Sequence, residues 1–424
     1  MHHPKRQAAL GFILATLLID VMGFAIVIPV FPDLIKGLIH SNLSDASSYT
    51  AWLAVAYAVT QFLFSPLVGN LSDRFGRRPV LLCSLLGFSA DYFFQAFAPT
   101  IGWLFVGRLL AGLTGASFTT ASAYIADISP PEKRAANFGL IGIAFGLGFI
   151  IGPFIGGLLG SINIHYPFIA AGALALLNAA YGYFILPESL APENRRSLDL
   201  KKINPFTTLA KLNKYKAVLG LAISLFLIYF SVQAVQSVWT FYTEYKFDWD
   251  KQMIGYSLAV VGVVYAAVQG GLTRIVIPKL GVERCIWIGL LLYSIGMALF
   301  GFATKGWMMY VFLVPYCLGG IAGPALQGYM SNHVPANAQG DLQGSLTSLA
   351  SLSTIFGPWV MLKIFHDFTK ADAPFIFPGA HFILGAVLML LSAVLAVLSF
   401  KKHGPPAVPP AGQTVNDNAA SPSA

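Results

Sequence analysis

Two aspartates of this chain lie deep inside long apolar segments. Asp20 falls within the apolar run 8–31, and Asp91 falls within the run 79–98. If both runs are helices, each carboxylate lies about 18 Å from the helix start, near the midplane of a bilayer. A carboxylate at that depth costs about 2.5–3.5 kcal/mol unless it is paired or hydrated, and desolvation favours its protonated form. Both acids are therefore predicted proton carriers; the alternative is a permanently paired acid that only bridges helices.

Arg108 is the one basic residue well inside the apolar runs of the first half of the chain. Its guanidinium stays charged, so an acid beside it releases a proton more readily. The alternative is that Arg108 pins its own helix to neighbouring backbone carbonyls. We predict that Asp20, Asp91 and Arg108 form a proton-coupling group.

Uncharged polar side chains and aromatic rings also recur at membrane depth. A cavity with apolar walls and a few polar groups suits a drug-sized ligand. For any single residue, the alternative is interhelical hydrogen bonding or lipid-facing packing. The predicted substrate-binding residues of this set are Gln61, Tyr57, Phe94, Asn178, Gln233, Gln236, Tyr265 and Gln327. Gln95, Gln269 and Gln343 are further amides at this depth.

The composition shows which elements must position these residues. The chain has 424 residues, is 56% hydrophobic and 10% charged, and has a mean hydropathy of +0.69. These values are typical of a polytopic membrane protein, in which each spanning helix needs about 20 apolar residues. Twelve runs qualify: 8–31, 49–70, 79–98, 101–124, 136–161, 166–186, 217–241, 253–277, 284–303, 307–330, 340–365 and 376–400. The predicted fold is an all-α membrane protein with twelve transmembrane helices arranged as two six-helix bundles.

Motifs for other chemistry are missing from the sequence. It has no phosphate-binding loop, no zinc-binding helix signature and no paired cysteines, so we expect no catalytic residues, metal or cofactor. Transport must then draw on an ion gradient rather than on ATP. The net charge of +8 could suggest nucleic acid, but Lys and Arg concentrate in the loops expected inside. This follows the positive-inside rule and predicts a multi-pass inner-membrane protein with both termini cytoplasmic.

The longest interior connection divides the chain. We predict an N-terminal bundle at 1–186, a cytoplasmic linker at 187–216, a C-terminal bundle at 217–400 and a disordered tail at 401–424. Gly76, Gly115 and the pair Gly152-Pro153 recur 205 residues later as Gly281, Gly320 and Gly357-Pro358. A parallel repeat of this kind places a substrate site between the halves near the midplane.

The segment 69–82 is dense in charge for so apolar a chain. Ion pairs within it favour a tight inner turn between two helices, and this turn is a predicted gate. Its residues are Gly69, Asp73, Arg74, Gly76, Arg77 and Arg78. Gly152 and Pro153 combine close helix approach with a kink, which predicts a hinge or a seal against proton leak, with ordinary tight packing as the alternative.

These segments resemble a known family. The loop at 69–82 resembles the signature of the major facilitator superfamily, Arg108 to Ala116 its helix 4 motif, and Gly148 to Gly157 the helix 5 motif of drug antiporters. The chain is most similar to the tetracycline/proton antiporters, from its start to about residue 400. The resemblance implies that Asp20 and Asp91 are essential acids and that Gln61 takes part in drug recognition.

The same resemblance implies a charge network at the inner gate. Asp73 would pack against the positive N-terminus of helix 11, and Arg77 and Asp127 would join it. The similar antiporters carry a further acid in helix 9, where this chain has Tyr293. Tyr293 is therefore a candidate substrate contact, and it leaves open whether tetracycline or another amphiphile is the substrate.

The sequence predicts a monomeric secondary transporter in the lipid bilayer that exports a small amphiphilic compound in exchange for protons. An importer or exporter of a sugar or other metabolite is the alternative within the same class. A non-transporting sensor or partner protein and a polytopic membrane enzyme are alternatives from other classes. No nucleic acid partner is expected.

Overall fold

The chain is described by a computed structural model that covers residues 3–115, 117–129, 131–190, 192–195, 216–333 and 339–403. Secondary structure within these ranges is helical. The first group of helices is α1 (His3–Ile26), α2 (Phe31–Ile39), α3 (Leu43–Phe75), α4 (Arg77–Phe97), α5 (Ile101–Thr114), α6 (Ser117–Ile128), α7 (Pro131–Ile162) and α8 (Tyr166–Ile185). A short 3-10 helix, η1 (Pro192–Asn194), follows them.

The second group begins after the predicted linker. It consists of α10 (Lys216–Phe247), α11 (Lys251–Ala267), the π-helical turn η4 (Val268–Leu272), α12 (Thr273–Leu280), α13 (Val282–Phe302), α14 (Gly306–Gly319), α15 (Ala322–Asn332), α16 (Gln339–Asp367) and α17 (Ala380–His403). Of the predicted linker 187–216, residue 191 and residues 196–215 lie outside the described residues, and so do residues 404–424 of the predicted tail 401–424. The predicted tail start at 401 differs from the structure, because α17 continues to His403.

The described residues contain eight helices long and apolar enough to cross a membrane, or ten if each bent pair counts as one span. The bent pairs are Leu10–Ile26 with Phe31–Ile39, and Leu43–Phe64 with Leu67–Phe75. Ile101–Thr114 and Lys251–Ala267 are shorter apolar helices. Each of the twelve expected spans therefore has a helical counterpart.

Three of the expected spans are interrupted between separate helices. The run 8–31 was expected to be one helix, but α1 ends at Ile26 and the chain bends by 46° into α2. Pro29 has no N–H to donate to a helix, and Pro32 starts the next helix, where its missing N–H costs nothing. The run 101–124 breaks at Gly115, and the run 307–330 breaks at Gly320.

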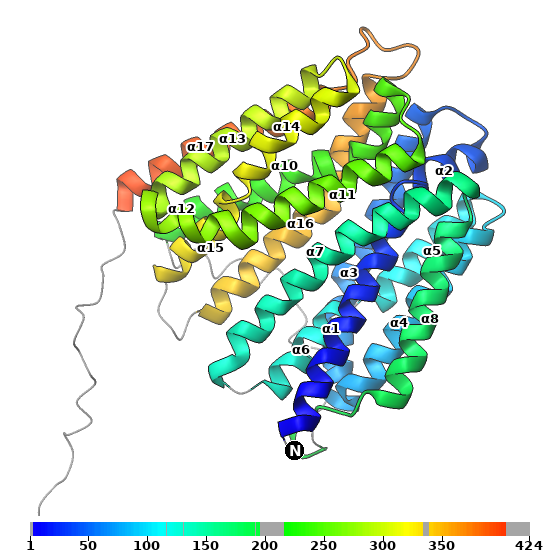
Figure 1. Cartoon of the computed structure of the whole chain (residues 1–424), viewed down its shortest axis with the longest axis vertical. Coiled ribbons are helices and arrows are strands. Elements are labelled where there is room, and N and C mark those ends of the chain that lie inside the picture. Colours follow the sequence, from blue (N-terminus) through cyan, green and yellow to red (C-terminus); the bar gives the residue numbers. More distant parts are fainter. Residues whose placement is uncertain are drawn as a thin grey trace, which may run out of the picture.

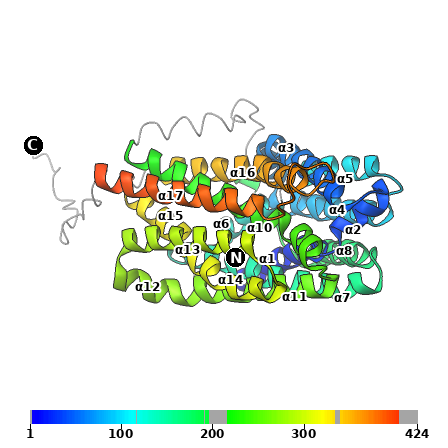
Figure 2. The same ribbon diagram turned by 90° about the horizontal axis from the view of Figure 1, so that it is seen from above.

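Helices α1–α8 pack mainly on one another, and so do α10–α17 (Figure 1). Within the first group, α1 packs on α7 and α8, and α4 packs on α8. Within the second, α10 packs on α16 and α17, and α13 packs on α14 and α17. The groups are joined mainly by α7 with α11 and by α3 with α16, and α3 also contacts α10 (Figure 2). The exact boundaries of the two predicted bundles remain a prediction.

The internal repeat is visible in the helix bounds. Helix α13 begins and ends 205 residues after α4, and α14 begins and ends 205 residues after α5. Gly76 and Gly281, which precede α4 and α13, have φ values of 108° and 81°. These backbone angles are strained for a side-chain-bearing residue, so both loops require glycine.

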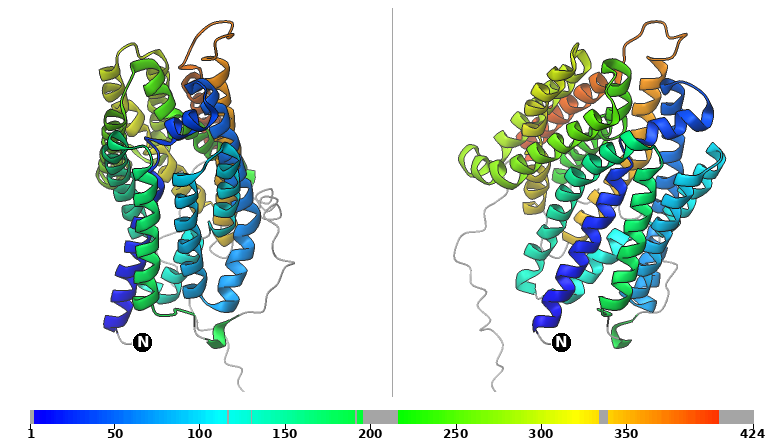
Figure 3. Two further views of the ribbon diagram at one scale, coloured as in Figure 1. Left: turned by 90° about the vertical axis from the view of Figure 1, so that its right-hand side faces the viewer. Right: turned by 45° about the vertical axis from the view of Figure 1, so that its right-hand side comes forward.

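The two groups touch at one end of the molecule and diverge toward the end that holds the N-terminus (Figure 3). At the joined end, Gly157 of α7 lies against Lys251 and Gly255 of α11. Ser44 of α3 hydrogen-bonds to the His366 carbonyl of α16 at 3.1 Å. This end corresponds to the predicted outer side, since the N-terminus is expected in the cytoplasm.

Candidate functional site

Asp91 and Arg108 form a buried ion pair between α4 and α5. The Nη2 atom of Arg108 donates to Oδ2 of Asp91, which is 3% exposed. Gln95, one turn along α4, donates to the same oxygen at 2.9 Å. The structure thus brings together the expected acid and its expected counter-ion.

The second oxygen of Asp91 has a different environment. Oδ1 is buried and has no hydrogen-bond partner among the described residues. Asp91 lines a pocket of about 230 Å³ between α4 and α5, together with Gly107, Leu110 and Thr114. A Cβ atom added at Gly107 would lie 3.0 Å from this oxygen. A carboxylate with one oxygen paired to Arg108 and the other unpartnered has a free position for a proton.

Asp20 belongs to the same electrostatic neighbourhood. Tyr57 of α3 and Tyr92 of α4 both interact electrostatically with the charges of Asp20, Asp91 and Arg108. The guanidinium carbon of Arg108 lies 5.7 Å from the centre of the Tyr57 ring, a cation–π contact. Residues of four helices, α1, α3, α4 and α5, therefore contribute to the surroundings of the predicted proton-coupling group.

Some of the predicted substrate-binding residues form polar or aromatic contacts, and these contacts lie separately in the first and in the second half. Gln61 of α3 donates to the Tyr57 hydroxyl at 3.1 Å and to the Gly115 carbonyl at 2.8 Å. In the second half, Gln327 donates to the Tyr229 hydroxyl at 2.6 Å. Tyr293 is buried, with its ring centre 5.1 Å from that of Tyr316.

The other candidates make helix-packing contacts. Asn178 is 2% exposed and exchanges hydrogen bonds of 3.2 Å with Thr16, joining α8 to α1. Gln233 packs against Gly357 of α16, and Gln236 is exposed. Phe94 borders the Asp91 pocket, with its ring centre 5.8 Å from that of Trp103. For Asn178 and Gln233 the contacts match the packing alternative stated for any single residue.

The charged loop is held by the ion pairs expected of it. Arg77 contacts Asp73 at 2.5 Å and Asp127 of α6 at 3.1 Å. Arg78 donates to the Tyr183 carbonyl at 2.5 Å and lies over the Tyr183 ring. Of the remaining predicted gate residues, Arg74 lies over the Phe75 ring and Gly69 has open space at its Cα. The expected contact between Asp73 and helix 11 remains a prediction, because the halves diverge at this end.

Glu188 completes the loop and was missed by the sequence analysis. Its carboxylate accepts from the backbone N–H groups of Arg77 and Arg78 at 2.8 and 3.2 Å, at the N-terminus of α4. A negative charge there is stabilised by the helix dipole. Glu188 lies in the predicted linker, 111 residues from Arg77, and no local pattern marks it as a cap.

Gly76→Ala is expected to loosen this inner turn. The substitution combines a strained φ of 108° with a Cβ atom that would overlap the Glu188 carboxylate. Gly281→Ala is the matched control, because its φ is 81° but its Cβ would meet nothing within 4 Å. Thermal unfolding of the two purified variants should show the larger loss of stability for Gly76→Ala, beyond the about 1–3 kcal/mol of backbone strain that both share. Equal losses would contradict a specific role for Glu188.

The joined end contains charges that the sequence analysis did not assign. Lys36 of α2 contacts Asp33 and Glu244 of α10, each at 2.5 Å, and Lys251 of α11 contacts Asp33. These four side chains, called here the outer charge cluster, link the two halves.

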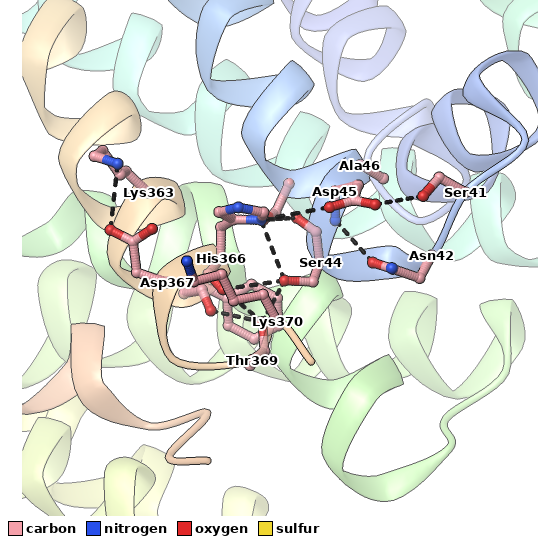
Figure 4. A network of polar contacts seen from close by, with 12 residues as sticks. Ser41, Asn42, Ser44, Asp45, Ala46, Lys363, His366, Asp367, Thr369 and Lys370 are labelled. Atoms are coloured by element: carbon pink, nitrogen blue, oxygen red, sulfur yellow. Dashed lines mark hydrogen bonds and ion pairs between the residues drawn. The ribbon is translucent and has the colours of Figure 1, made fainter. Parts of the chain in front are cut away.

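A second network lies nearby, between α3 and α16 (Figure 4). The His366 ring points toward Ser44 and Asp45; its Nδ1 atom lies 2.9 Å from the Ser44 carbonyl. The Ser44 and Thr369 hydroxyls lie 2.8 Å apart. Polar contacts thus join the halves at the outer end, from α2 to α10 and α11 and from α3 to α16.

Gly152 and Pro153 lie where α7 passes between α1 and α11. A Cβ atom at Gly152 would lie 2.6 Å from the Ala25 Cβ of α1. The Pro153 carbonyl lies close to Gly255 of α11, where an added Cβ would approach it to 2.5 Å. Gly152 therefore serves the packing of α7 on α1 within the first half, and Pro153 serves the contact of α7 with α11 between the halves. Their role as a hinge stays a prediction.

Two helical groups joined at one end, with a buried ion pair and amides inside the bundle, define a membrane transporter rather than an enzyme. The sequence profile of the Major Facilitator Superfamily matches residues 13–358 and 221–422. The chain belongs to this superfamily and, within it, to the family of the tetracycline resistance proteins.

Individual relatives support this assignment. The tetracycline resistance protein of class C from Escherichia coli is 41% identical, over 91% of this chain and 96% of that protein. The class G protein from Vibrio anguillarum is 37% identical, over 88% and 93%. Among solved structures, the nucleoside transporter NupG superposes with a TM-score of 0.75 at 13% identity, over 93% of this chain and 100% of that one, and shares the fold.

Proposed function

We propose that this protein exports a tetracycline-type amphiphile from the cytoplasm in exchange for protons. It acts as a monomer in the inner membrane with both termini cytoplasmic. The observation that carries the proposal is the buried pair of Asp91 and Arg108, whose charges act on the same two tyrosines, Tyr57 and Tyr92, as the charge of Asp20. The names of the curated relatives support tetracycline as the first substrate to test.

The ion pair supplies a switch that responds to protons. A proton that binds Asp91 removes its negative charge, so the attraction to Arg108 falls from an ion pair to a neutral hydrogen bond. The released guanidinium stays charged, and it must find another acceptor or water. Protonation thus changes the packing of α4 against α5, and rocking of the two halves exposes the site to the opposite side.

The second half has a tyrosine, Tyr293, at the position where the similar antiporters carry a membrane-embedded acid. The Tyr293 side chain is buried and packs against the Tyr316 ring. A tyrosine pair offers neutral hydrogen-bonding groups rather than a negative charge. This favours, as a second candidate, export of an amphiphile that does not need a carboxylate in the second half.

Transport of radiolabelled tetracycline into everted membrane vesicles tests the proposal. We expect uptake that requires an imposed pH gradient and that stops when a proton uncoupler is added. Asp20→Asn should abolish the response to the gradient, whereas Asp372→Asn, a change at an exposed outer-end residue, should not. Uptake of tetracycline that is insensitive to the uncoupler would refute proton coupling. No uptake of tetracycline, with gradient-driven uptake of another amphiphile, would replace the substrate.

A further inference from the structure

The amide of Gln61 is bound in a specific way at the break between α5 and α6. Its nitrogen has two hydrogens, and the Tyr57 hydroxyl and the Gly115 carbonyl take them at 3.1 and 2.8 Å. Gly115 is the residue at which α5 ends. A broken helix inside a membrane leaves backbone groups without helical partners, and these must be satisfied by neighbours. We call Tyr57, Gln61 and Gly115 the first clasp.

The second half contains the same arrangement. Gln269 donates to the Tyr265 hydroxyl at 3.1 Å and to the Gly320 carbonyl at 2.7 Å. Gly320 is the residue at which α14 ends, before α15 begins at Ala322. Tyr265, Gln269 and Gly320 form the second clasp. In the first clasp, side chains of α3 bind the backbone at the end of α5. In the second clasp, Tyr265 of α11 and Gln269 of η4 are joined in the same way to the end of α14.

The sequence spacing shows that the clasps are copies. Helices α3 and α11 begin at side-chain caps: Asn42 accepts from the Asp45 N–H, and Asp250 accepts from the Met253 N–H. The cap, the tyrosine and the glutamine recur at one offset of 208 residues. The pairs are Asn42 and Asp250, Tyr57 and Tyr265, and Gln61 and Gln269. The two glycines recur at 205, the offset of α4 with α13.

The fit between side chain and glycine is also duplicated. A Cβ atom at Gly115 would lie 3.0 Å from the Gln61 amide nitrogen. A Cβ atom at Gly320 would lie 2.8 Å from the Tyr265 ring. In both clasps, glycine is the residue that lets the neighbouring helix reach the break. The π-helical turn η4 includes Gln269, and π-turns in helices are common at functional sites.

The surroundings of the two clasps differ in charge. Tyr57 lies under Arg108, which pairs with Asp91, so the first clasp touches the proton-coupling group. Tyr265 lies instead near Tyr293 and Tyr316, which are neutral. One clasp is thus connected to a group that responds to protons, and the other is not.

We propose that Gln269 and Gln61 are matched positioning residues that hold the two broken helices in their bent form during transport. The first clasp also transmits the charge state of the ion pair to the break at Gly115. The second clasp supports the break at Gly320 without sensing protons. The proton-sensing difference rests on the proposed function; the existence and support role of the second clasp do not.

Hydrogen–deuterium exchange of the purified protein in lipid nanodiscs tests the clasp itself. Gln269→Leu should speed exchange in the peptide that contains Gly320 roughly tenfold, the factor for one lost hydrogen bond, and leave the Gly115 peptide unchanged. Gln61→Leu should do the reverse. Tyr265→Phe, which removes one hydroxyl, gives a milder version if Gln269→Leu does not fold. Unchanged exchange at Gly320 in both second-clasp variants would overturn the proposal.

Transport kinetics test the difference between the clasps. With tetracycline in everted vesicles, Gln269→Leu should lower kcat several-fold at every pH while KM and the pH profile stay unchanged. Gln61→Leu should also shift the pH profile, because Tyr57 contacts Arg108. Asp372→Asn, a change at an exposed outer-end residue, is the control for a polar group lost outside the clasps. A raised KM with normal kcat in Gln269→Leu would make Gln269 a substrate contact instead. If the wild type does not transport tetracycline, the proposed substrate fails while the exchange measurements still decide the clasp.

Discussion

Replacing Asp91 with asparagine is expected to abolish gradient-driven transport. Asparagine keeps the size of the side chain but can neither bind nor release the proton, and it leaves Arg108 without its ion-pair partner. Removing one member of a buried ion pair costs about 3–5 kcal/mol, so a rate that depends on the pair should fall by about 100-fold or more. The measurement is the initial rate of tetracycline uptake in everted vesicles with and without an imposed pH gradient.

Two comparisons separate coupling from folding in that experiment. Asp91→Glu keeps a titratable group and should retain part of the gradient response. Exchange of labelled for unlabelled tetracycline needs no proton movement, so it should persist in Asp91→Asn if the protein is folded. Full gradient-driven uptake by Asp91→Asn would remove Asp91 from the coupling mechanism, and the proton would then have to bind elsewhere, with Asp20 the first alternative.

The pairing of Asp91 with Arg108 was open to prediction because charge is scarce. In a chain with 10% charged residues, an acid and a base at membrane depth in consecutive helices have few other partners. The gate loop was predictable for the same reason, since Asp73 and Arg77 are four residues apart across the turn at Gly76 and pair at 2.5 Å. Local spacing and desolvation cost determine both contacts.

Other site features depend on tertiary structure that no local pattern encodes. Lys36 and Glu244 are 208 residues apart, and each alone reads as an ordinary surface charge near a helix end. Glu188 accepts from the backbone N–H groups of Arg77 and Arg78. Because every residue except proline carries such a group, no residue type in the sequence marks this contact. The second clasp was missed because the glutamine and glycine repeats have different offsets, 208 and 205, so an alignment at either offset shows half of it.

In the first expected span, a long apolar run favours one continuous helix, whereas the proline within it favours a break. Hydropathy alone predicts one helix over 8–31, since the apolar run continues through Pro29. The structure places the break at residues 27–30, between α1 and α2. The bend carries Asp33 and Lys36 toward the second half, where they meet Lys251 and Glu244. A straight helix would direct these charges away from the outer charge cluster.

Gly157→Val is expected to open the outer end of the transporter. A Cβ atom at Gly157 would lie 2.5 Å from the Lys251 carbonyl, so valine must push α7 away from α11. Overpacking of this kind costs about 1–3 kcal/mol. Because the cost falls only on the state in which the outer end is closed, the equilibrium should shift toward the outward-open state roughly tenfold or more. Gradient-driven transport should fall in parallel, since the cycle requires both states.

Cysteine accessibility measures this shift directly. Ser47 of α3 is 0% exposed and contacts the Leu362 carbonyl of α16, so Ser47→Cys reports on separation at the outer end. With Cys83, Cys285 and Cys317 replaced by serine, a membrane-impermeant maleimide added outside should label it slowly in the parent and roughly tenfold faster with Gly157→Val. Gly146→Val, also on α7 with nothing within 4 Å of its Cβ, should leave the labelling rate unchanged. Slow labelling in Gly157→Val would show that the outer charge cluster and the His366 network hold the end closed without close packing of α7 on α11.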